Sequence, residues 1–303
     1  MDALFILHAS QDPGSIMVAA FTVAALTPLM AALISRMRDS NLYTDVRGGT
    51  PRGTGLVPWI VLSVFMPEPL RSPVVIMGLL AFIDDLSGRR RIRDLPVEWG
   101  QLSRGLGIIA VTILTYPIMG PAALLVALMI QPLNIADMQP GVACSLTVIM
   151  SLLAAAIAFA AGSDIYLPLL VLAVCAAYSP LDYLGRIMMG EVGNHSFAVA
   201  LGLAFYVAGG PWSVLMLFLT APLVTAILRR GNLTGFLEEK IGIENPTFGD
   251  LYMDVMTGGG LGDLLRRILL GRRSFRVDNR VLIAVGVRRL LFNPYASHGS
   301  ENR

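Results

Sequence analysis

The stretch Leu79-Leu80-Ala81-Phe82-Ile83-Asp84-Asp85 decides how this chain is built, because an apolar run ends there in two adjacent aspartates. Four arginines follow at once: Arg89, Arg90, Arg91 and Arg93. Ionisable residues at membrane depth are rare unless they serve a site, and adjacent carboxylates repel each other unless a cation neutralises them. The pattern predicts a helix that ends at a water-facing surface, with a divalent cation and a phosphate group at its mouth. The plainer alternative is a polar helix end followed by a solvated run of charge.

The composition is that of a polytopic membrane protein. The chain has 303 residues, of which 55% are hydrophobic and only 15% are charged, whereas soluble domains carry roughly 25% charged residues. The arginines flank apolar segments as topology signals do, so no nucleic-acid partner is expected. Cys144 and Cys175 both lie in apolar surroundings and indicate no disulfide framework or metal cage. The first apolar segment lacks a basic start and a cleavage site and is interpreted as a retained span.

A membrane-spanning helix needs about 20 apolar residues, and nine segments are candidates. They are residues 16–34, 56–66, 74–83, 108–119, 122–130, 142–161, 166–177, 197–208 and 214–228. Residues 231–303 are more polar and hold amphipathic pieces at 261–270 and 281–292, the first of which is a candidate for a tenth span. The expected fold is all-α, a single integral membrane domain over residues 1–303 with about nine or ten transmembrane helices. Residues 1–230 would form the core spans, and 231–303 a cytoplasmic loop with amphipathic or terminal helices.

The loops alternate in character along the chain. The loops after spans one, three, five, seven and nine hold nearly all the polar motifs, namely Arg47 and Arg52, Asp84 and Asp85, Asn134 and Asp137, Glu191, and Arg229. The opposite loops, at residues 67–72, 120–121, 162–165 and 209–212, hold a single basic residue, Arg71. Cytoplasmic loops carry an excess of Lys and Arg. We therefore expect a multi-pass protein of the cell membrane with its N-terminus outside and an active-site cleft on the cytoplasmic face.

These loops together suggest metal and phosphate chemistry. Carboxylate and amide oxygens are suitable ligands for Mg²⁺. Enzymes that transfer phosphoryl groups commonly use Mg²⁺ together with nearby arginines. Glycines beside Glu191 would let backbone amides approach a phosphate closely. Asn134 and Asp137 share one face if their segment is helical. Taken singly, each loop could equally be a turn or a helix cap; it is their common face that favours a site.

Four motifs in sequence order resemble the polyprenyl-phosphate N-acetylhexosamine-1-phosphate transferase family, of the glycosyltransferase family 4 type and related to phospho-N-acetylmuramoyl-pentapeptide transferase. They are Arg47 with Pro51-Arg52-Gly53-Thr54-Gly55; Phe82-Ile83-Asp84-Asp85-Leu86 with Gln101; Pro132-Leu133-Asn134-Ile135-Ala136-Asp137; and Arg186-Ile187-Met188-Met189-Gly190-Glu191-Val192-Gly193-Asn194. The resemblance covers roughly residues 47–201. It implies ten membrane helices, a Mg²⁺ cofactor, and transfer of a sugar 1-phosphate from a UDP-sugar to polyprenyl phosphate with release of UMP, in envelope or cell-wall glycan synthesis.

The resemblance also implies roles for particular residues. Asp84, Asp85 and Asp137 would be catalytic, the pair positioning metal and acceptor phosphate while Asp137 or one member of the pair deprotonates or orients the acceptor. Glu191 and Asp85 would bind the metal. The substrate-binding residues would be Arg47, Arg52, Asn134, Gly193 and Asn194. Partners would be the lipid phosphate, the UDP-sugar and the membrane, and a homodimer is left open.

The chain also departs from the family pattern. After Asp137 the chain reads Met138-Gln139-Pro140-Gly141, without the family's second aspartate, and Glu191 stands where the family has an aspartate. Val97 replaces a lysine, and the family's histidine-rich loop near the C-terminus is missing. His195 is interpreted as packing at the start of a span.

The departures from the family pattern define the first alternative, a catalytically degenerate member that binds a lipid phosphate or a partner. The second alternative is a membrane transporter, which predicts acidic residues in mid-span and broken helices at matching positions of two halves.

Overall fold

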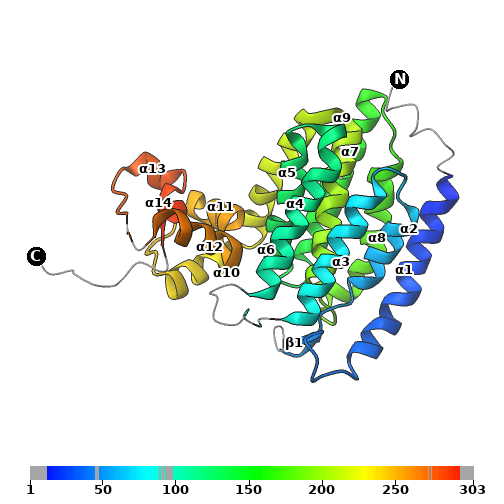
Figure 1. Cartoon of the computed structure of the whole chain (residues 1–303), viewed down its shortest axis with the longest axis horizontal. Helices are drawn as coiled ribbons and strands as arrows, with labels where there is room; N and C mark the ends of the chain where they lie inside the picture. The colour runs from blue at the N-terminus through cyan, green and yellow to red at the C-terminus, as the bar shows by residue number, and fades with distance from the viewer. Residues whose placement is uncertain are drawn as a thin grey trace, which may run out of the picture. The chain divides into compact units, whose positions relative to one another are not determined.

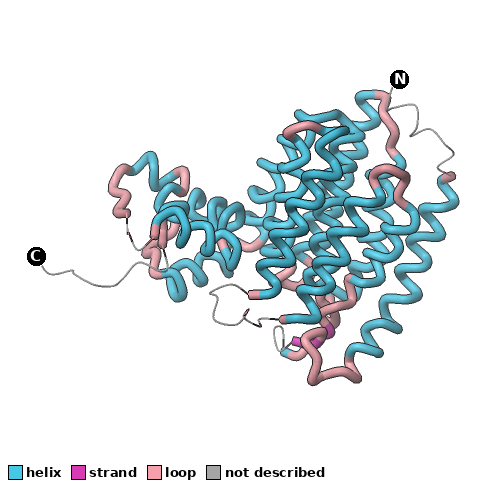
Figure 2. The backbone as a smooth tube through the Cα atoms, viewed as in Figure 1, coloured by secondary structure: helices cyan, strands magenta, loops and turns pink. Residues whose placement is uncertain are grey.

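The computed structural model describes residues 12–44, 48–88, 90, 92, 98–271, 273 and 275–293. Two compact units are formed, Met1–Ala221 and Pro222–Arg303, and the boundary falls inside the long helix α9 (Gly190–Leu228). The described chain is almost entirely helix and loop, apart from one two-stranded antiparallel pair (Figure 2). The all-α prediction is thereby confirmed, while the single membrane domain stays a prediction.

The first unit is a bundle whose helices lie side by side (Figure 1). Its elements are α1 (Pro13–Ile34), β1 (Tyr43–Thr44), β2 (Thr50–Pro51), α2 (Leu56–Phe65), α3 (Arg71–Ser87), α4 (Trp99–Met119), α5 (Ala122–Leu128), α6 (Ile130–Ala136), α7 (Val142–Ala161), α8 (Tyr166–Tyr183) and the start of α9. Helix α3 packs on α4, α7 on α8, and α1 on both α8 and α2. Local signals set several ends: Asp12 caps α1, with Pro13 at its first position, and Gly162 ends α7 in the left-handed region.

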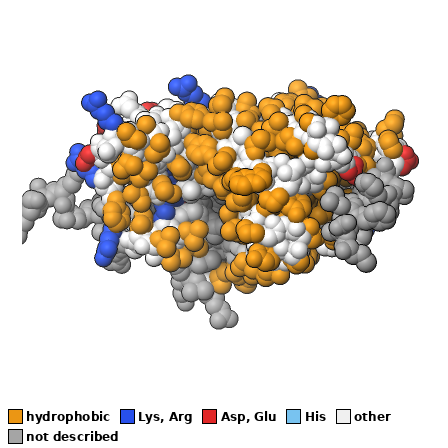
Figure 3. Space-filling model, turned by 90° about the horizontal axis from the view of Figure 1, so that it is seen from above, with side chains coloured by type: hydrophobic (Ala, Val, Ile, Leu, Met, Phe, Trp, Pro, Cys, Tyr) orange, Lys and Arg blue, Asp and Glu red, His pale blue; other side chains and the backbone are white. Residues whose placement is uncertain are grey.

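Five helices are long and apolar enough to cross a membrane by length and composition: α1, α4, α7, α8 and α9. Helix α2 and the pair α5–α6 are apolar but shorter. The expected nine or ten spans are therefore matched only in part among the described residues. Large hydrophobic side chains are exposed on these helices, among them Phe21, Ile113 and Phe159, and hydrophobic side chains cover much of the face in Figure 3. This surface is typical of a chain embedded in a bilayer.

Helix α9 is broken at the place that the sequence predicts as the loop between its eighth and ninth spans. Gly209 and Gly210 have non-helical dihedral angles, with φ of −159° and 70°. Every residue from 187 to 205 is buried, and a helix apolar on all sides belongs inside a bundle. Its neighbours include α4, through a hydrogen bond from the Tyr206 hydroxyl to the Ile118 carbonyl, and α5, through contact of Gly202 with Val126. The first part of α9 is thus the core of the unit.

Some predicted boundaries shift. The loop expected at residues 131–141 is helical as far as Ala136, where α6 ends, and α3 continues past Ile83 until Gly88, which has φ of 60°. The aspartate pair therefore lies in the last turns of a helix rather than after it.

The second unit holds the end of α9, α10 (Arg230–Phe236), a π-helical turn (Leu237–Ile241), α11 (Phe248–Thr257), α12 (Gly259–Leu270), α13 (Arg280–Ala284) and α14 (Val287–Leu291). Two ion pairs join α11 to α14: a partly exposed one from Asp250 to Arg288 at 2.6 Å and a buried one from Asp254 to Arg289 at 2.7 Å. Helix α12 exposes Leu265, Ile268 and Leu269, which agrees with the amphipathic pattern of its sequence.

Candidate functional site

One buried carboxylate, that of Glu191, joins four segments of the first unit. Its Oε1 lies 3.1 Å from Nη2 of Arg52. Its Oε2 lies 3.0 Å from Nη2 of Arg104, accepts a hydrogen bond of 2.7 Å from Nδ2 of Asn134 and lies 3.1 Å from Nε2 of His195. Glu191 is the second residue of α9, so the start of that helix is the meeting point of the site. We call these side chains, with Asp84, Asp85 and Asp137, the polar cluster.

Asp85 of α3 and Asp137, the residue that follows α6, accept hydrogen bonds from backbone amides at the start of α9. Asp137 accepts from the Met189 and Gly190 amides at 3.4 and 3.1 Å. Asp85 accepts from the Glu191 and Val192 amides at 3.0 and 2.9 Å. The first amides of a helix have no partner within it and attract negative charge. From the sequence, backbone amides beside Glu191 are expected to bind a phosphate. In the structure the four consecutive amides of residues 189–192 instead bind the protein's own carboxylates.

Glycine is required at position 190 by this arrangement. Gly190 has φ of 68°, and a Cβ there would lie 2.9 Å from Oδ2 of Asp85 and 3.1 Å from the Arg52 carbonyl oxygen. A side chain would add strain in the left-handed region and displace the aspartate.

The other member of the aspartate pair faces α4. Oδ2 of Asp84 lies 3.3 Å from Nη2 of Arg104, and its Oδ1 lies against Gly100, where any side chain would collide with it. The same Arg104 nitrogen contacts Glu191. One guanidinium therefore bridges two carboxylates that are far apart in sequence.

Arg52 contacts the other carboxylate oxygen of Glu191, Oε1, whereas Arg104 contacts Oε2. Nη2 of Arg52 contacts Oδ1 of Asp85 at 3.3 Å as well as Glu191. Burial by itself disfavours the charged guanidinium, but the carboxylates of Asp85 and Glu191 favour it, and the pKa of Arg52 ends above its ordinary value. Arg52 is thus a fixed positive charge at the edge of the cluster, with its side chain 25% exposed.

The loop that carries Arg52 is fastened to the segment before α9. The Met188 amide donates to the Pro51 carbonyl at 2.9 Å, and the Gly55 amide to the Met189 carbonyl at 3.1 Å. Thr54 donates to the Met188 carbonyl at 2.9 Å. Gly55 and Gly193 are so close that a Cβ on either one would collide with the other's backbone. The position of Arg52 therefore depends on backbone contacts as much as on its ion pairs.

Most of the predicted site residues meet in the polar cluster: Arg52, Asp84, Asp85, Asn134, Asp137 and Glu191. Gly193 packs against Gly55. Asn194 is 2% exposed, and its Oδ1 has no hydrogen-bond partner within the described ranges. Arg47 lies outside the described residues, as do Arg89, Arg91 and Arg93.

Two members of the cluster are not predicted from the sequence. Arg104 precedes an apolar segment and has the appearance of a topology signal, although Gln101 and Arg104 share the three-residue spacing of a helix face. His195 is fully buried, as expected for a packing residue, but it also contacts Glu191. The i,i+4 spacing of these two residues on one helix is the signal that indicates their contact.

Magnesium prefers oxygen ligands, and the polar cluster is rich in carboxylate oxygens. Yet both oxygens of Asp85, Asp137 and Glu191 are in contact with nitrogen donors. Within the part of the chain that the structure describes, no group of three or more His, Cys, Asp or Glu side chains is placed to hold a metal ion. In this arrangement Glu191 and Asp85 do not fit a magnesium site, and Mg²⁺ stays a prediction of the resemblance.

The arrangement can bind anions and handle protons. Two guanidiniums provide charge-assisted donors, and Nε of both Arg52 and Arg104 has no hydrogen-bond partner among the described residues. Asp84 supplies a carboxylate beside them.

A comparison of the chain with protein-family models gives no match, and a search of curated proteins gives none either.

Proposed function

We propose that the chain transfers a sugar 1-phosphate from a UDP-sugar to polyprenyl phosphate at the cytoplasmic face of the cell membrane and releases UMP. The observation that carries the proposal is the assembly of Arg52, the aspartate pair, Asn134 with Asp137, and Glu191 in one cluster. These residues come from the four motifs that resemble the transferase family, and they are separated by up to 139 residues along the chain.

Each group of the cluster has a part in this reaction. Arg52 and Arg104 neutralise phosphate oxygens, on which charge accumulates during phosphoryl transfer. Asp85 and Asp137 are positioning residues, since their oxygens hold the start of α9. Asp84 is the remaining carboxylate and accepts the proton of the acceptor phosphate. Asn134 and Asn194 contact the uridine or the sugar.

The chemical step is a substitution at phosphorus. An oxygen of the polyprenyl phosphate attacks the β-phosphorus of the UDP-sugar and forms a new P–O bond. The bond from that phosphorus to the oxygen bridging to the α-phosphate breaks, and UMP leaves with this oxygen and its electron pair.

A screen of UDP-sugars tests the proposal. Membranes that contain the chain should release UMP and form a labelled lipid product with at least one UDP-sugar. Asp84→Asn keeps the size of the side chain and should lower turnover by about 10²- to 10⁴-fold, the usual contribution of a positioned base. Asp39→Asn, in an exposed turn, is the matched control and should leave turnover unchanged. Unchanged turnover in Asp84→Asn, or no UMP from any UDP-sugar, would refute the proposal.

The same assay tests the magnesium prediction. Turnover that disappears with a chelator and returns with added Mg²⁺ would support an ion that displaces the guanidinium contacts. Turnover that continues with a chelator would support phosphate neutralisation by Arg52 and Arg104 alone.

A second candidate is a catalytically degenerate relative that binds lipid phosphate without turnover. The observation that favours it is the pairing of both guanidiniums with carboxylates at 3.0 to 3.3 Å, which compensates the charges before any ligand arrives. Purified protein that binds polyprenyl phosphate but releases no UMP with any UDP-sugar would favour this candidate.

A further inference from the structure

Helix α12 presents an apolar face to the outside of the second unit. Leu265, Ile268 and Leu269 are 51%, 68% and 78% exposed, and their spacing of three and four residues places them on one side of the helix. An amphipathic helix at the surface of a globular domain buries its apolar side against the core. Helix α12 therefore exposes the side that its sequence alone would place against the rest of the unit.

The polar side of α12 faces the other helices of the unit. Arg266 is 5% exposed. Its guanidinium donates to Oδ1 of Asp263 at 2.6 Å, to the Thr257 hydroxyl at 2.6 Å and to the Leu290 carbonyl at 3.1 Å. Oδ1 of Asp263 also lies 3.9 Å from Nη2 of Arg289. A rotation of the helix that buried its leucines would break these contacts at a high cost, so they fix the apolar face on the outside.

The chain that follows this apolar face is basic. Arg273, Arg276 and Arg280 are exposed, and residues 265–280 hold six arginines but one acidic residue, Asp278. Asp278 lies 2.9 Å from Nε of Arg276 in an exposed ion pair, which offsets one of these charges only weakly. An apolar face beside net positive charge is complementary to a bilayer with anionic headgroups.

Helix α12 is too short to cross a bilayer. Its 12 residues rise about 18 Å, whereas the hydrocarbon core is about 30 Å thick. The helix is thus too short for the tenth span that its apolar residues suggest. A helix with one apolar face, one polar face and basic residues nearby is typical of a segment that lies in the plane of the membrane interface.

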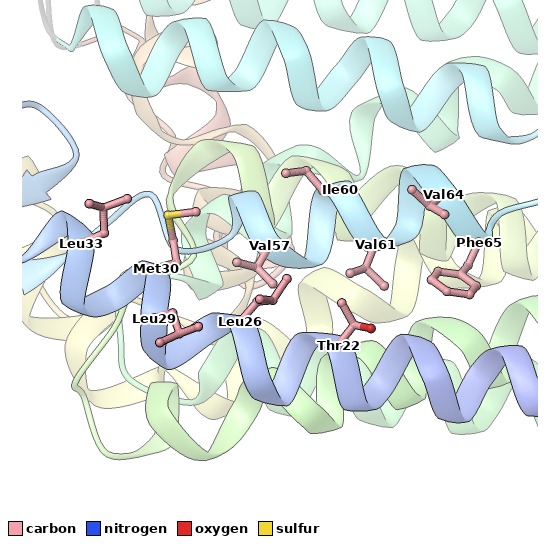
Figure 4. Close-up of a pocket in the computed structure, with 10 residues that line it drawn as sticks. All are labelled: Thr22, Leu26, Leu29, Met30, Leu33, Val57, Ile60, Val61, Val64 and Phe65. Atoms are coloured by element: carbon pink, nitrogen blue, oxygen red, sulfur yellow. The ribbon is translucent and has the colours of Figure 1, made fainter.

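The apolar groove between α1 and α2 offers no comparable pairing of apolar and charged groups. Figure 4 shows its lining, from Leu33 to Phe65. Among the described lining residues only Thr22 has a polar side chain, and its hydroxyl donates to the Val18 carbonyl of its own helix at 2.7 Å. Such a lining does not select one lipid over another, whereas α12 with the basic chain beside it does.

We propose that α12 binds the interface of an anionic membrane, with Leu265, Ile268 and Leu269 among the acyl chains and Arg273 and Arg276 among the headgroups. Burial of the three side chains removes apolar surface from water. The arginines add an attraction to anionic lipid that a neutral bilayer does not supply. The inference goes beyond the proposed reaction, because none of these residues belongs to the polar cluster and the binding needs no turnover.

A fluorescent label at Ile268→Cys tests where the helix lies. The whole chain is placed in nanodiscs of phosphatidylcholine, with or without phosphatidylglycerol, and lipids brominated near the headgroup end of the acyl chain quench a label that touches them. Quenching should be strong when phosphatidylglycerol is present and weak without it. The same label at Glu239→Cys, an exposed position of the same unit, should stay unquenched in both. Both native cysteines are buried, which restricts labelling to the new site.

Arginine substitutions test the preference for anionic lipid. Arg273→Gln combined with Arg276→Gln should lower the ratio of quenched to unquenched label about tenfold or more, since each basic residue near an anionic surface contributes roughly fivefold. Arg36→Gln combined with Arg38→Gln removes the same charge at exposed positions of the first unit and should leave the ratio unchanged.

Three results would overturn the proposal. A label that stays in water with phosphatidylglycerol present would show that α12 does not bind the bilayer. Equal quenching with and without phosphatidylglycerol would show an ordinary lipid-facing surface. A label that is shielded from water but not quenched by brominated lipid would show that a protein, such as a second copy of the chain, covers this face.

Discussion

At the residue scale, Glu191 is where segments from α4, α6, α9 and the Arg52 loop meet through one carboxylate. A buried charge is costly to leave without its partners, whereas a complete set of partners can be close to neutral in free energy. The cluster is therefore sensitive to the loss of any single charge, and most sensitive to the loss of the one that the others share.

Glu191→Gln should be strongly destabilising. It leaves Arg52 and Arg104 with one carboxylate each in buried surroundings, and removing one partner of a buried pair costs about 3–5 kcal/mol of unfolding free energy. Thermal unfolding in detergent measures the change. Glu238→Gln, at an exposed position, is the control, with an expected effect within about 0.5 kcal/mol. Equal stability of the two variants would contradict the role given to Glu191.

Arg104→Lys should separate stability from function. A lysine keeps the charge between Asp84 and Glu191, so the unfolding free energy should change little. It lacks the planar fork and its additional donors, so the KM for the phosphate-bearing substrates should rise about tenfold, as for the loss of roughly 1.4 kcal/mol. The control is Arg36→Lys, at an exposed position. An unchanged KM would mean that Arg104 has only a structural role.

The sequence predicts the acidic members of the site better than their partners. Asp84 and Glu191 lie at the ends of apolar segments, where ionisable residues are rare unless they serve a site. Arg104 is different, because an arginine near the start of an apolar segment is expected in any membrane protein. The role of Arg104 depends on how α4 packs on α3, and a local sequence pattern does not specify that packing.

At the scale of elements, the loop at residues 51–55 is held by the backbone of residues 188–193. Gly55→Ala should destabilise the protein by about 1–3 kcal/mol or more, because the new Cβ would collide with backbone atoms of Met189 and Gly193. Gly105→Ala, with open space around the added Cβ, should be neutral or slightly stabilising. Thermal unfolding of both variants tests this, and a stable Gly55→Ala protein would contradict the close approach.

The elements follow the sequence where a local signal exists. The span predicted at residues 142–161 coincides with α7, and the glycine pair Gly209-Gly210 breaks α9 where a loop is expected. The sequence ends the third span at Ile83 because charge begins there, yet α3 continues because Asp84 and Asp85 find partners on α4 and α9. Apolar runs locate membrane segments, but tertiary contacts decide how far each helix continues beyond them.

At the scale of the whole chain, the cluster supports the predicted common face of the polar motifs, and labelling can test which face it is. Helix α7 rises about 30 Å, enough to place its two ends on opposite sides of a bilayer. Met138→Cys should react with a membrane-impermeant maleimide only in inside-out vesicles, and Ser163→Cys only in intact cells. Both native cysteines are buried, which keeps the background low. The reverse pattern would overturn the assignment of the N-terminus to the outside.

The burial of the first part of α9 has a consequence for biogenesis. The ribosome makes Arg52, Asp84, Asp85, Arg104 and Asn134 before it makes Glu191, so the polar cluster stays incomplete while α1 to α8 are being made. We therefore expect the arrival of α9 to complete the buried interior in a single late step. A chain that stops before residue 189 should be recognised by membrane proteases, whereas one that continues past the first part of α9 should escape them.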